Sequence, residues 1–543
     1  MRMTGGTAVV SALLAEGVDT IFGLPGIQND WFYNALYDAG DRIRVIHTRH
    51  EQGAAYMALG YALARGGIGV YNVVPGPGVL NTTAALATAY ALNAQVLCLT
   101  GQIPLAAIGR DGGVLHEIPD QLGVLRSLTK WAERATSVAE AGRLTTEAFV
   151  ALRSGRPRPV ALEVPMDVLA AEADVDVVGP PMPGANEPLD DDLLSEAVAL
   201  LAGARRPLIW VGGGAHGASA AIRQLADHLQ APVGSYRTGR GVVDSRHHLA
   251  LVQPQAHALW RDVDVVLAIG TNMRVPLQNW GVDDRLQVIR VDVDPATHDR
   301  VTRPAVALTA RAEDAVPRLL EWLTREVSPR PSRRDEMAVL AAQWREQSAF
   351  LQPQIAYLDV IREALGEHGV FVDELTQVGF SARVVMPVYH PRTFISTGYQ
   401  GTLGYGFQTA LGVKVARPDV PVISVTGDGG FMFGVQELAT AVQHGINLVT
   451  IVFNNNQYGN VQHMQRTLYG QRVIATDLRN PNFPQLAASF GAAGYRAETP
   501  DALADALHHA LAAGLPALIE VPCGDMPDVD RFRKLPRLRG GKG

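Results

Sequence analysis

The stretch that decides the fold runs from Val420 to Gly459 and reads VPVISVTGDGGFMFGVQELATAVQHGINLVTIVFNNNQYG. Val420 to Thr426 is an apolar, β-branched run, which predicts a buried strand. Apolar residues recur at helical spacing from Phe433 to His444, and a second buried strand is predicted from Leu448 to Phe453. Two strands joined by one helix are expected to be parallel neighbours with a right-handed crossover, so their carboxyl ends should lie side by side.

Polar residues leave both predicted strands at that shared edge. Asp428 follows the first strand and Asn455 follows the second. A carboxylate and an amide oxygen are hard ligands of the kind Mg2+ takes when it is shared with substrate phosphates, and the backbone carbonyl of Gln457 would complete the protein's share. Three glycines let backbone N–H groups approach a phosphate beside a helix N-terminus: Gly427, Gly429 and Gly430. An ordinary turn and loop are the alternative, but the strand-helix-strand context favours a magnesium site for a diphosphate, with Asp428, Asn455 and Gln457 as ligands.

This stretch is similar to the cofactor motif of thiamine diphosphate (ThDP) enzymes of the acetolactate synthase, 2-oxo acid decarboxylase and benzaldehyde lyase superfamily. The resemblance covers nearly the whole chain and rests on three motifs: HEQGAAYMALGYA from His50, GTLGYG from Gly401 and GDG…NNNQYG from Gly427. It implies that ThDP and Mg2+ are the cofactors. It also implies that Tyr458 and Gly459, which end the third motif, belong to the cofactor site.

Composition places the chain among ordinary globular proteins. A length of 543 residues suggests about three domains, and 47% hydrophobic with 19% charged residues is typical of such domains. The net charge of −7 argues against a nucleic-acid partner. No apolar run reaches membrane-spanning length and no signal-peptide pattern is present, so we expect no membrane association and a cytoplasmic location. Cys98 and Cys523 lie in apolar runs and are expected to be buried and reduced.

Two proline-rich stretches, 175–188 and 326–335, are predicted linkers between three α/β blocks. Alternating strands and helices predict a doubly wound parallel sheet in each block. The predicted domains are residues 1–174, 189–325 and 337–526, followed by a basic tail at 527–543 that is expected to be solvated. The family resemblance implies a pyrimidine-binding first domain, a central domain and a diphosphate-binding third domain. It also implies that a C-terminal segment can cover the active site.

Glu51 is predicted to open a helix, Glu51 to Ala64, after a strand from Ile43 to Thr48. Taken alone, a carboxylate at this position interacts with the helix dipole. The resemblance implies a catalytic role, in which Glu51 hydrogen-bonds the aminopyrimidine of ThDP and exchanges the proton that generates the nucleophile. It further implies that the Gly401 carbonyl binds the exocyclic amine and that Leu403 props the cofactor into a bent shape. Core packing is the alternative for Leu403.

Two more residues are predicted to be catalytic. Gln28 leaves the first strand, Thr20 to Gly23, and is expected to approach the thiazolium ring. His116 resembles a position that is glutamine in acetolactate synthases and benzaldehyde lyase, where it would shuttle a proton, although a surface histidine is the alternative. The chain also departs from acetolactate synthases, since Met464 stands where those making branched-chain precursors carry tryptophan.

The central block contains a formal G-x-G-x-x-G pattern at 212–217 after a strand from Pro207 to Val211. A dinucleotide site also needs an acidic residue after the next strand, and Pro232 to Tyr236 is followed by Arg237 instead. Some family members hold FAD or ADP in this domain. FAD is therefore possible here but is not the favoured prediction.

The sequence predicts a ThDP- and Mg2+-dependent enzyme that decarboxylates a 2-oxo acid and ligates the product to a second carbonyl. The alternatives are a benzaldehyde-lyase-like cleavage of a 2-hydroxy ketone, a cyclic diketone hydrolase, a nicotinamide oxidoreductase and a non-catalytic nucleotide-binding homologue. Intact Glu51, Asp428 and Asn455 argue against the last. In this family two subunits share each site, which implies a homodimer as the minimum unit and commonly a homotetramer.

Overall fold

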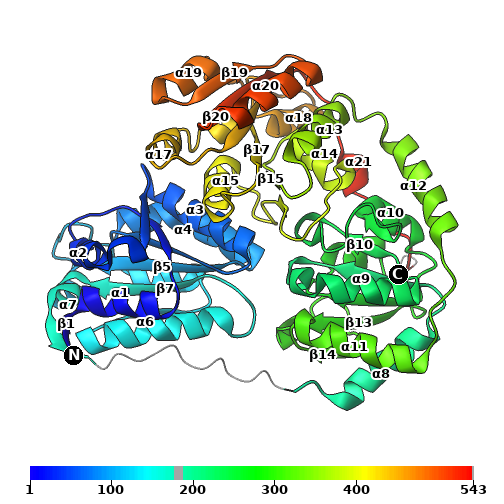
Figure 1. Ribbon diagram of the computed structural model, residues 1–543, viewed down its shortest axis with the longest axis horizontal. Coiled ribbons are helices and arrows are strands. Elements are labelled where there is room, and N and C mark those ends of the chain that lie inside the picture. The colour runs from blue at the N-terminus through cyan, green and yellow to red at the C-terminus, as the bar shows by residue number, and fades with distance from the viewer. Residues whose placement is uncertain (176–187, 541–543) are drawn as a thin grey trace.

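The computed structural model describes residues 1–175 and 188–540. Three domains, each built on a six-stranded parallel sheet flanked by helices, form the chain (Figure 1). In that view the N-terminal domain is blue and lies at the lower left, the central domain is green and lies at the right, and the C-terminal domain lies above both. The predicted class, three doubly wound α/β domains, is confirmed. Of the predicted linker 175–188, the part from 176 to 187 lies outside the described residues.

The N-terminal sheet has the strand order β3-β2-β4-β5-β7-β6. Its strands are β2 Thr20–Gly23, β3 Arg44–His47, β4 Ile68–Val73, β5 Gln95–Gln102, β6 Ala132–Arg134 and β7 Val160–Pro165. Its helices are α1 Gly5–Ala15, α2 Asp30–Ala39, α3 Glu51–Arg65, α4 Pro77–Leu92, α5 Gln121–Leu128, α6 Val138–Arg153 and α7 Met166–Ala170. A small antiparallel pair, β1 Arg2–Thr4 with β8 Glu172–Asp174, joins the two ends of the domain.

The C-terminal sheet has the order β16-β15-β17-β18-β20-β19, the same order as the N-terminal sheet when strands are counted from the start of each domain. Its strands are β15 Val370–Val372, β16 Phe394–Ile395, β17 Val422–Gly427, β18 Val449–Asn454, β19 Ala493–Arg496 and β20 Ala517–Pro522. Its helices are α13 Gln354–Leu365, α14 Gln377–Val385, α15 Tyr405–Ala416, α16 Asp428–Phe431, α17 Glu437–Gln443, α18 Gly459–Leu468, α19 Phe483–Phe490, α20 Pro500–Ala512 and α21 Asp530–Arg533.

The central sheet has the order β11-β10-β9-β12-β13-β14, which is the 3-2-1-4-5-6 order of doubly wound nucleotide-binding folds. Its strands are β9 Pro207–Val211, β10 Val233–Ser235, β11 Ala250–Val252, β12 Val265–Ile269, β13 Gln287–Asp292 and β14 Val306–Thr309. Its helices are α8 Asp191–Gly203, α9 Ser219–Leu229, α10 Gln253–Leu259 and α11 Ala312–Glu326. Helix α12, Arg334–Ser348, then leads to the C-terminal domain (Figure 1).

Three sequence expectations concern details of these elements. The helix predicted from Phe433 is wrong at its start, because the chain makes turns there and α17 begins only at Glu437. Gly434 packs directly against Gln408, since a Cβ at this glycine would lie 2.6 Å from that side chain.

Both cysteines are free, but Cys523 is only partly buried. In the described part of the chain no helix is long and apolar enough to cross a membrane.

The prediction that the basic tail is solvated is wrong for Arg539, whereas Arg531, Lys534 and Arg537 are exposed. Arg539 is 4% exposed, and its guanidinium forms an ion pair with Asp283 at 2.7 Å. The same guanidinium donates to the backbone carbonyls of Trp260 and Arg261 at 2.7 and 2.8 Å. His257 bonds to the carbonyl of Pro536 at 2.8 Å. The guanidinium of Arg539 therefore holds the end of the tail against the central domain.

The two outer domains meet where α3 crosses α15 at backbone contact distance. A Cβ at Gly60 would lie 2.0 Å from the Thr409 carbonyl oxygen, and one at Gly412 would lie 1.9 Å from the Met57 carbonyl oxygen. Only glycine permits such an approach. These two residues therefore fix how closely the domains pack.

Substituting Gly60 by alanine should lower the thermal unfolding midpoint, because overpacking at a tight contact costs roughly 1–3 kcal/mol. Gly203→Ala is the matched control, since a Cβ there meets nothing within 4 Å and alanine is the better helix former. Differential scanning fluorimetry of both variants provides the measurement. Equal midpoints for Gly60→Ala and the wild type would contradict the backbone contact described above.

Candidate cofactor and catalytic site

Strands β17 and β18 are parallel neighbours, as the sequence predicts, and Gly427 pairs with Phe453 in their register. Asp428 follows β17 directly, so its side chain lies at the edge where β18 also ends. Asn480 connects the two strand ends. Its amide lies 2.6 Å from the Asp428 Oδ2, 3.0 Å from the Asn454 Oδ1 and 3.2 Å from the Asn456 Oδ1. Sequence reasoning missed Asn480, because it lies in a loop far along the chain and in no motif.

The Asp428 carboxylate is buried and lacks a cationic partner. It is 2% exposed and forms no ion pair with any residue in the described ranges. Burial raises the pKa of this carboxyl group, while hydrogen bonds from Asn480 and from the backbones of Gly429 and Gln457 act in the opposite direction. A buried carboxylate of this kind is stabilised by a bound cation.

The chemistry of the available donors fits Mg2+ held together with a diphosphate. Among the described residues no group of three or more His, Cys, Asp or Glu side chains is placed so that it could hold a metal ion. Asp428 and Asn455 supply a carboxylate and an amide oxygen, and the backbone of Gln457 lies within hydrogen-bonding reach of Asp428. Phosphate oxygens would complete such a set, because Mg2+ is usually bound through one or two carboxylates plus substrate phosphates.

The loop after β18 is packed closely around this edge. A Cβ at Gly429 would lie 2.6 Å from the ring of Tyr458, and one at Gly459 would lie 2.8 Å from the Asn455 amide nitrogen. The Gln457 side chain turns away to Asp525, with its amide nitrogen 3.3 Å from the Asp525 carboxylate. These glycines are required by neighbouring groups of the protein as well as by any phosphate.

Glu51 is the first residue of α3, as predicted, and its side chain is 18% exposed. The amide of Asn81 donates to its carboxylate at 3.0 Å. His50 caps the helix, since its Nδ1 accepts from the Gln52 backbone N–H at 3.1 Å. Within the described residues no hydrogen bond or ion pair links Glu51 to Asp428.

Glu437, which sequence reasoning missed, fixes the start of α3 from the C-terminal domain. Its buried carboxylate accepts from the backbone N–H groups of Arg49 and His50 at 3.1 and 2.9 Å. A carboxylate at a helix N-terminus is electrostatically favourable. Burial raises the pKa of Glu437, and these hydrogen bonds oppose the shift. The position of Glu51 thus depends on a residue of another domain.

A third buried carboxylate, Glu374, connects the segment that carries Gly401 and Leu403 to β17. It accepts from the Gly404 backbone N–H at 2.6 Å and from the Thr426 hydroxyl. A Cβ at Gly430 would lie 2.6 Å from the same carboxylate. Burial raises the pKa of Glu374 to about 7. Gly401 has a φ of 58°, so glycine is favoured at that turn.

Gln28 and His116, predicted as separate candidates, form one hydrogen-bonded pair. His116 Nδ1 lies 2.8 Å from Gln28 Oε1, and the Gln28 amide donates to the Leu115 carbonyl at 2.9 Å. Gln28 is 2% exposed, whereas His116 is partly exposed. The neighbouring Asn29 is internal to its loop, because its side chain bonds the backbone of Leu24 and Gly26.

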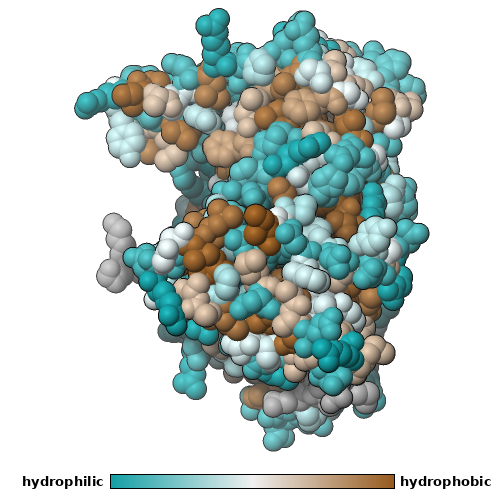
Figure 2. All heavy atoms as spheres, turned by 90° about the vertical axis from the view of Figure 1, so that its left-hand side faces the viewer, coloured by the Kyte–Doolittle hydropathy of each residue, from teal (hydrophilic) through white to brown (hydrophobic). Residues whose placement is uncertain are grey.

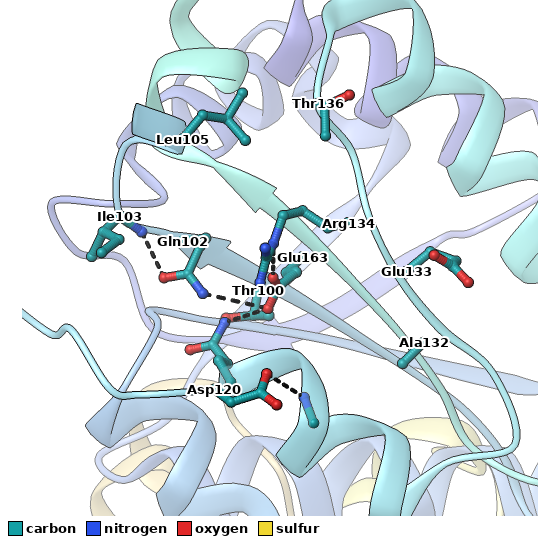
Figure 3. Close-up of polar contacts among 12 residues, drawn as sticks. Thr100, Gln102, Ile103, Leu105, Asp120, Ala132, Glu133, Arg134, Thr136 and Glu163 are labelled. Atoms are coloured by element: carbon teal, nitrogen blue, oxygen red, sulfur yellow. Dashed lines mark hydrogen bonds and ion pairs between the residues drawn. The ribbon is translucent and has the colours of Figure 1, made fainter. Parts of the chain in front are cut away.

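A buried polar network supports the loop that carries His116 (Figure 3). Glu163 is fully buried, is paired with Arg134, and accepts from Gln121 at 3.0 Å and from Gln102 at 3.5 Å. Gln121 in turn accepts from the Gly76 backbone N–H at 2.8 Å. A Cβ at Gly76 would lie 2.3 Å from the His116 carbonyl oxygen, so the network reaches this loop directly.

The glycine pattern of the central domain is explained by packing within the protein. Cβ atoms at Gly212 and Gly214 would lie 2.4 and 2.9 Å from the backbone of Gly270. One at Gly217 would lie 1.9 Å from the Glu313 carboxylate. His216, in the same turn, is buried, and burial lowers its pKa to about 4. The pattern therefore needs no bound pyrophosphate to account for it.

The raised pKa of Glu374 gives a testable pH dependence. A carboxyl group whose folded pKa lies near 7 rather than 4.5 binds its proton more tightly in the folded state. Its contribution to stability is therefore full below about pH 4.5 and is lost as the pH rises through about 7, by about 3 kcal/mol at most. Glu374→Gln should flatten this part of the curve of unfolding midpoint against pH.

Glu196→Gln, a substitution at an exposed position of α8, is the matched control and should leave the curve unchanged. Thermal midpoints are to be measured across the pH range between the two pKa values. An identical slope for the wild type and Glu374→Gln would show that this carboxyl group does not titrate as described.

Two outer domains with the same strand order and a central domain with a nucleotide-binding fold match the class of three-domain thiamine pyrophosphate enzymes. Family models agree along the chain: a thiamine pyrophosphate enzyme N-terminal TPP binding domain matches residues 3–124, a central domain matches 194–319 and a C-terminal TPP binding domain matches 375–521.

Proteins of similar sequence or structure carry names from the same class of enzyme. A probable 2-ketoarginine decarboxylase of Pseudomonas aeruginosa is 34% identical over 508 residues, covering 90% of this chain and 89% of that protein. A probable acetolactate synthase large subunit of Methanocaldococcus jannaschii is 33% identical over 550 residues, covering 96% and 92%. The structure of a thiamine diphosphate-dependent 4-hydroxybenzoylformate decarboxylase of Rhodococcus jostii RHA1 shares the fold, with a TM-score of 0.83 and 24% identity over 96% of this chain and 99% of that one.

The chain belongs to the thiamine pyrophosphate enzyme family. It is a thiamine diphosphate-dependent enzyme of the acetolactate synthase and 2-oxo acid decarboxylase type.

Proposed function

We propose that this enzyme decarboxylates a 2-oxo acid with ThDP and Mg2+ and ligates the product to a second carbonyl compound. The observation that carries the proposal is the Asp428 edge, where a buried carboxylate without a cationic partner lies beside amide oxygens and glycine-rich backbone. Asp428, Asn455 and the Gln457 carbonyl would hold the metal. Gly427, Gly429, Gly430, Tyr458 and Gly459 would surround the diphosphate.

The remaining predicted residues would orient the cofactor and exchange protons with it. ThDP, when bound, supplies a carbon nucleophile and an electron sink. Glu51, placed at the α3 N-terminus by Glu437, would exchange a proton with the aminopyrimidine ring. Gly401 would bind the amine through its carbonyl, and Leu403 would hold the cofactor bent.

The Gln28–His116 pair is the candidate for handling the substrate. A histidine can hold or release a proton near neutral pH, and the hydrogen bond to buried Gln28 fixes the orientation of its ring. Relatives carry the names of a 2-ketoarginine decarboxylase and an acetolactate synthase, which supports a 2-oxo acid as donor. Cleavage of a 2-hydroxy ketone, or hydrolysis of a cyclic diketone, is the alternative.

Chelation followed by gel filtration should remove Mg2+ with the cofactor and abolish activity, and adding Mg2+ with ThDP should restore it. The assay uses a panel of 2-oxo acids, with CO2 release and chiral product analysis followed together. A 2-hydroxy ketone product supports carboligation, and an aldehyde alone supports simple decarboxylation. Full activity in protein shown by mass spectrometry to contain no ThDP would refute the cofactor assignment.

We also propose that the working unit is a homodimer, with the site shared between subunits. Large apolar side chains are exposed on loops of both outer domains, and hydrophobic surface is visible on the side of the molecule that these domains form (Figure 2). The exposed residues include Ile27, Leu115, Met432, Phe433, Leu468 and Ile474. Exposed apolar surface of this extent commonly marks a protein contact. The absence of a described link from Glu51 to Asp428 within one chain agrees with this arrangement.

Mixing two inactive variants, Glu51→Gln and Asp428→Ala, tests the shared site. A mixed dimer places both defects in one site and leaves the other intact, so about half the activity per mixed dimer should return on grounds of symmetry. Each variant mixed with itself is the control. If native mass spectrometry confirms exchange and no activity returns, each site is built within one chain.

A further inference from the structure

A cavity of about 450 Å3 lies between the central domain, helix α12 and the end of helix α14. Its walls include β10 and β11 at the edge of the central sheet and Val384 to Pro387 of the C-terminal domain. None of the predicted cofactor or catalytic residues lines it, and neither does the glycine turn at 212–217. The cavity is therefore separate from the cofactor site, and it lies beside the carboxyl ends of β9, β10 and β11, where Val211, Ser235 and Val252 line it.

The charges on its walls have one sign. Six basic side chains line the cavity and no acidic one does. They are Arg240, Arg246, His247, His248, Arg334 and Arg345. A cavity of one charge sign attracts ligands of the opposite sign.

Three of the six basic groups are already satisfied by the protein. Arg246 pairs with Asp244 and Glu367 at 2.6 and 2.8 Å. His247 lies 3.0 Å from the Asp227 carboxylate. Arg240 is buried and donates to backbone carbonyls of the segment after α14 and of α14 itself. These groups hold the walls together and leave little charge to offer a ligand.

The guanidinium groups of Arg334 and Arg345 are different, because neither makes a hydrogen bond or ion pair within the described ranges. Burial lowers the pKa of His248, and the neighbouring charges of His247 and Arg334 act in the same direction. His248 also has a protein partner, because its Nε2 lies 3.3 Å from the Gln230 Oε1, so Arg334 is the cationic group that remains at this end of the cavity. Arg345 lies three helical turns further on, about 16 Å along α12.

The rest of the wall between these arginines is apolar or small. Ala338 and Ala341 share the face of α12 with them, and Met337, Trp344 and Met386 flank that face. A volume of about 450 Å3 lies in the range of small-molecule sites, roughly 300–1,000 Å3. A ligand that suits this wall has an apolar body and an anionic end.

We infer that this cavity binds a small organic anion, with a phosphate or carboxylate held by Arg334 and an apolar body lying along α12. Arginine is suited to both anions because its planar fork donates two parallel hydrogen bonds. Because the walls come from two domains and the helix that joins them, the bound molecule would hold the central and C-terminal domains in a fixed relation. The inference does not depend on which reaction the cofactor site performs.

The test uses enzyme saturated with ThDP and Mg2+, with 2-naphthyl phosphate and 2-naphthoate as anionic probes and neutral 2-naphthol as the comparison. Isothermal titration calorimetry should give at least about tenfold tighter binding for an anionic probe than for 2-naphthol, as expected for charge-assisted hydrogen bonds. Arg334→Gln should remove this difference. Arg223→Gln is the matched control, since it changes an exposed arginine of α9 that does not line the cavity.

The two probes distinguish a phosphate site from a carboxylate site, and binding of either supports the inference. Three results would overturn it: equal affinity for the anions and 2-naphthol, unchanged anion binding by Arg334→Gln, or displacement of the probe by excess ThDP. Circular dichroism of Arg334→Gln should match the wild type, because the substituted side chain is exposed and unpaired.

Discussion

The structure depends on the contact between α3 and α15, where two helices from different domains touch backbone to backbone. Gly60 and Gly412 allow that approach. The Glu437 carboxylate then accepts from the backbone N–H groups of Arg49 and His50, the two residues before α3, so it fixes the direction in which α3 begins. Glu51 is the first residue of this helix, and its position is set by packing between domains rather than by its own loop. If Glu51 is the catalytic acid, as we propose, the fold pre-organises it.

Some buried carboxylates in this chain pair with an arginine, whereas Asp428, Glu374 and Glu437 form no ion pair in the described ranges and are held by hydrogen bonds. Glu163 pairs with Arg134, and Asp373 pairs with Arg383 at 2.7 Å. Asp428 has no such partner among the described residues, although burying an uncompensated charge costs several kcal/mol. Under the function proposed above, a cation bound there would offset that cost, and metal binding would be linked to folding stability at this edge.

Local sequence patterns were enough to predict the sheets and the motif edge, because strand and helix periodicity and glycine turns are local signals. Asp428 and the end of β18 meet as predicted, and Gln28 bonds His116 although no sequence pattern pairs them. Asn480 and Glu437 could not be found in this way, since each acts through a long-range contact that no short motif records. The end of the tail was mispredicted for a similar reason: Arg539 looks solvated until the carbonyl groups of the central domain are placed around it.

The twin sheets give the α3–α15 contact a symmetry of its own. Helix α3 follows the second strand of the N-terminal sheet, and α15 follows the second strand of the C-terminal sheet, so equivalent elements pack on each other. The contacts are reciprocal: Gly60 meets Thr409 while Gly412 meets Met57, and Tyr56 packs edge-on against Tyr405. Equivalent surfaces in mutual contact are the signature of a two-fold relation, here within one chain.

Because the two outer domains are related in this way, their equivalent turns and helices can be compared, and they carry different residues. The turn after β17 carries Asp428, whereas the equivalent turn after β4 carries Pro75 and Gly76 and no carboxylate. The opposite holds for the equivalent helices α3 and α15. Helix α3 begins with the carboxylate residue Glu51, whereas α15 begins after Gly404 and has no carboxylate there. Each copy therefore offers one charged edge that the other lacks. Because the α3–α15 contact uses both copies at once, a change at either glycine should disturb the acid and the metal edge together.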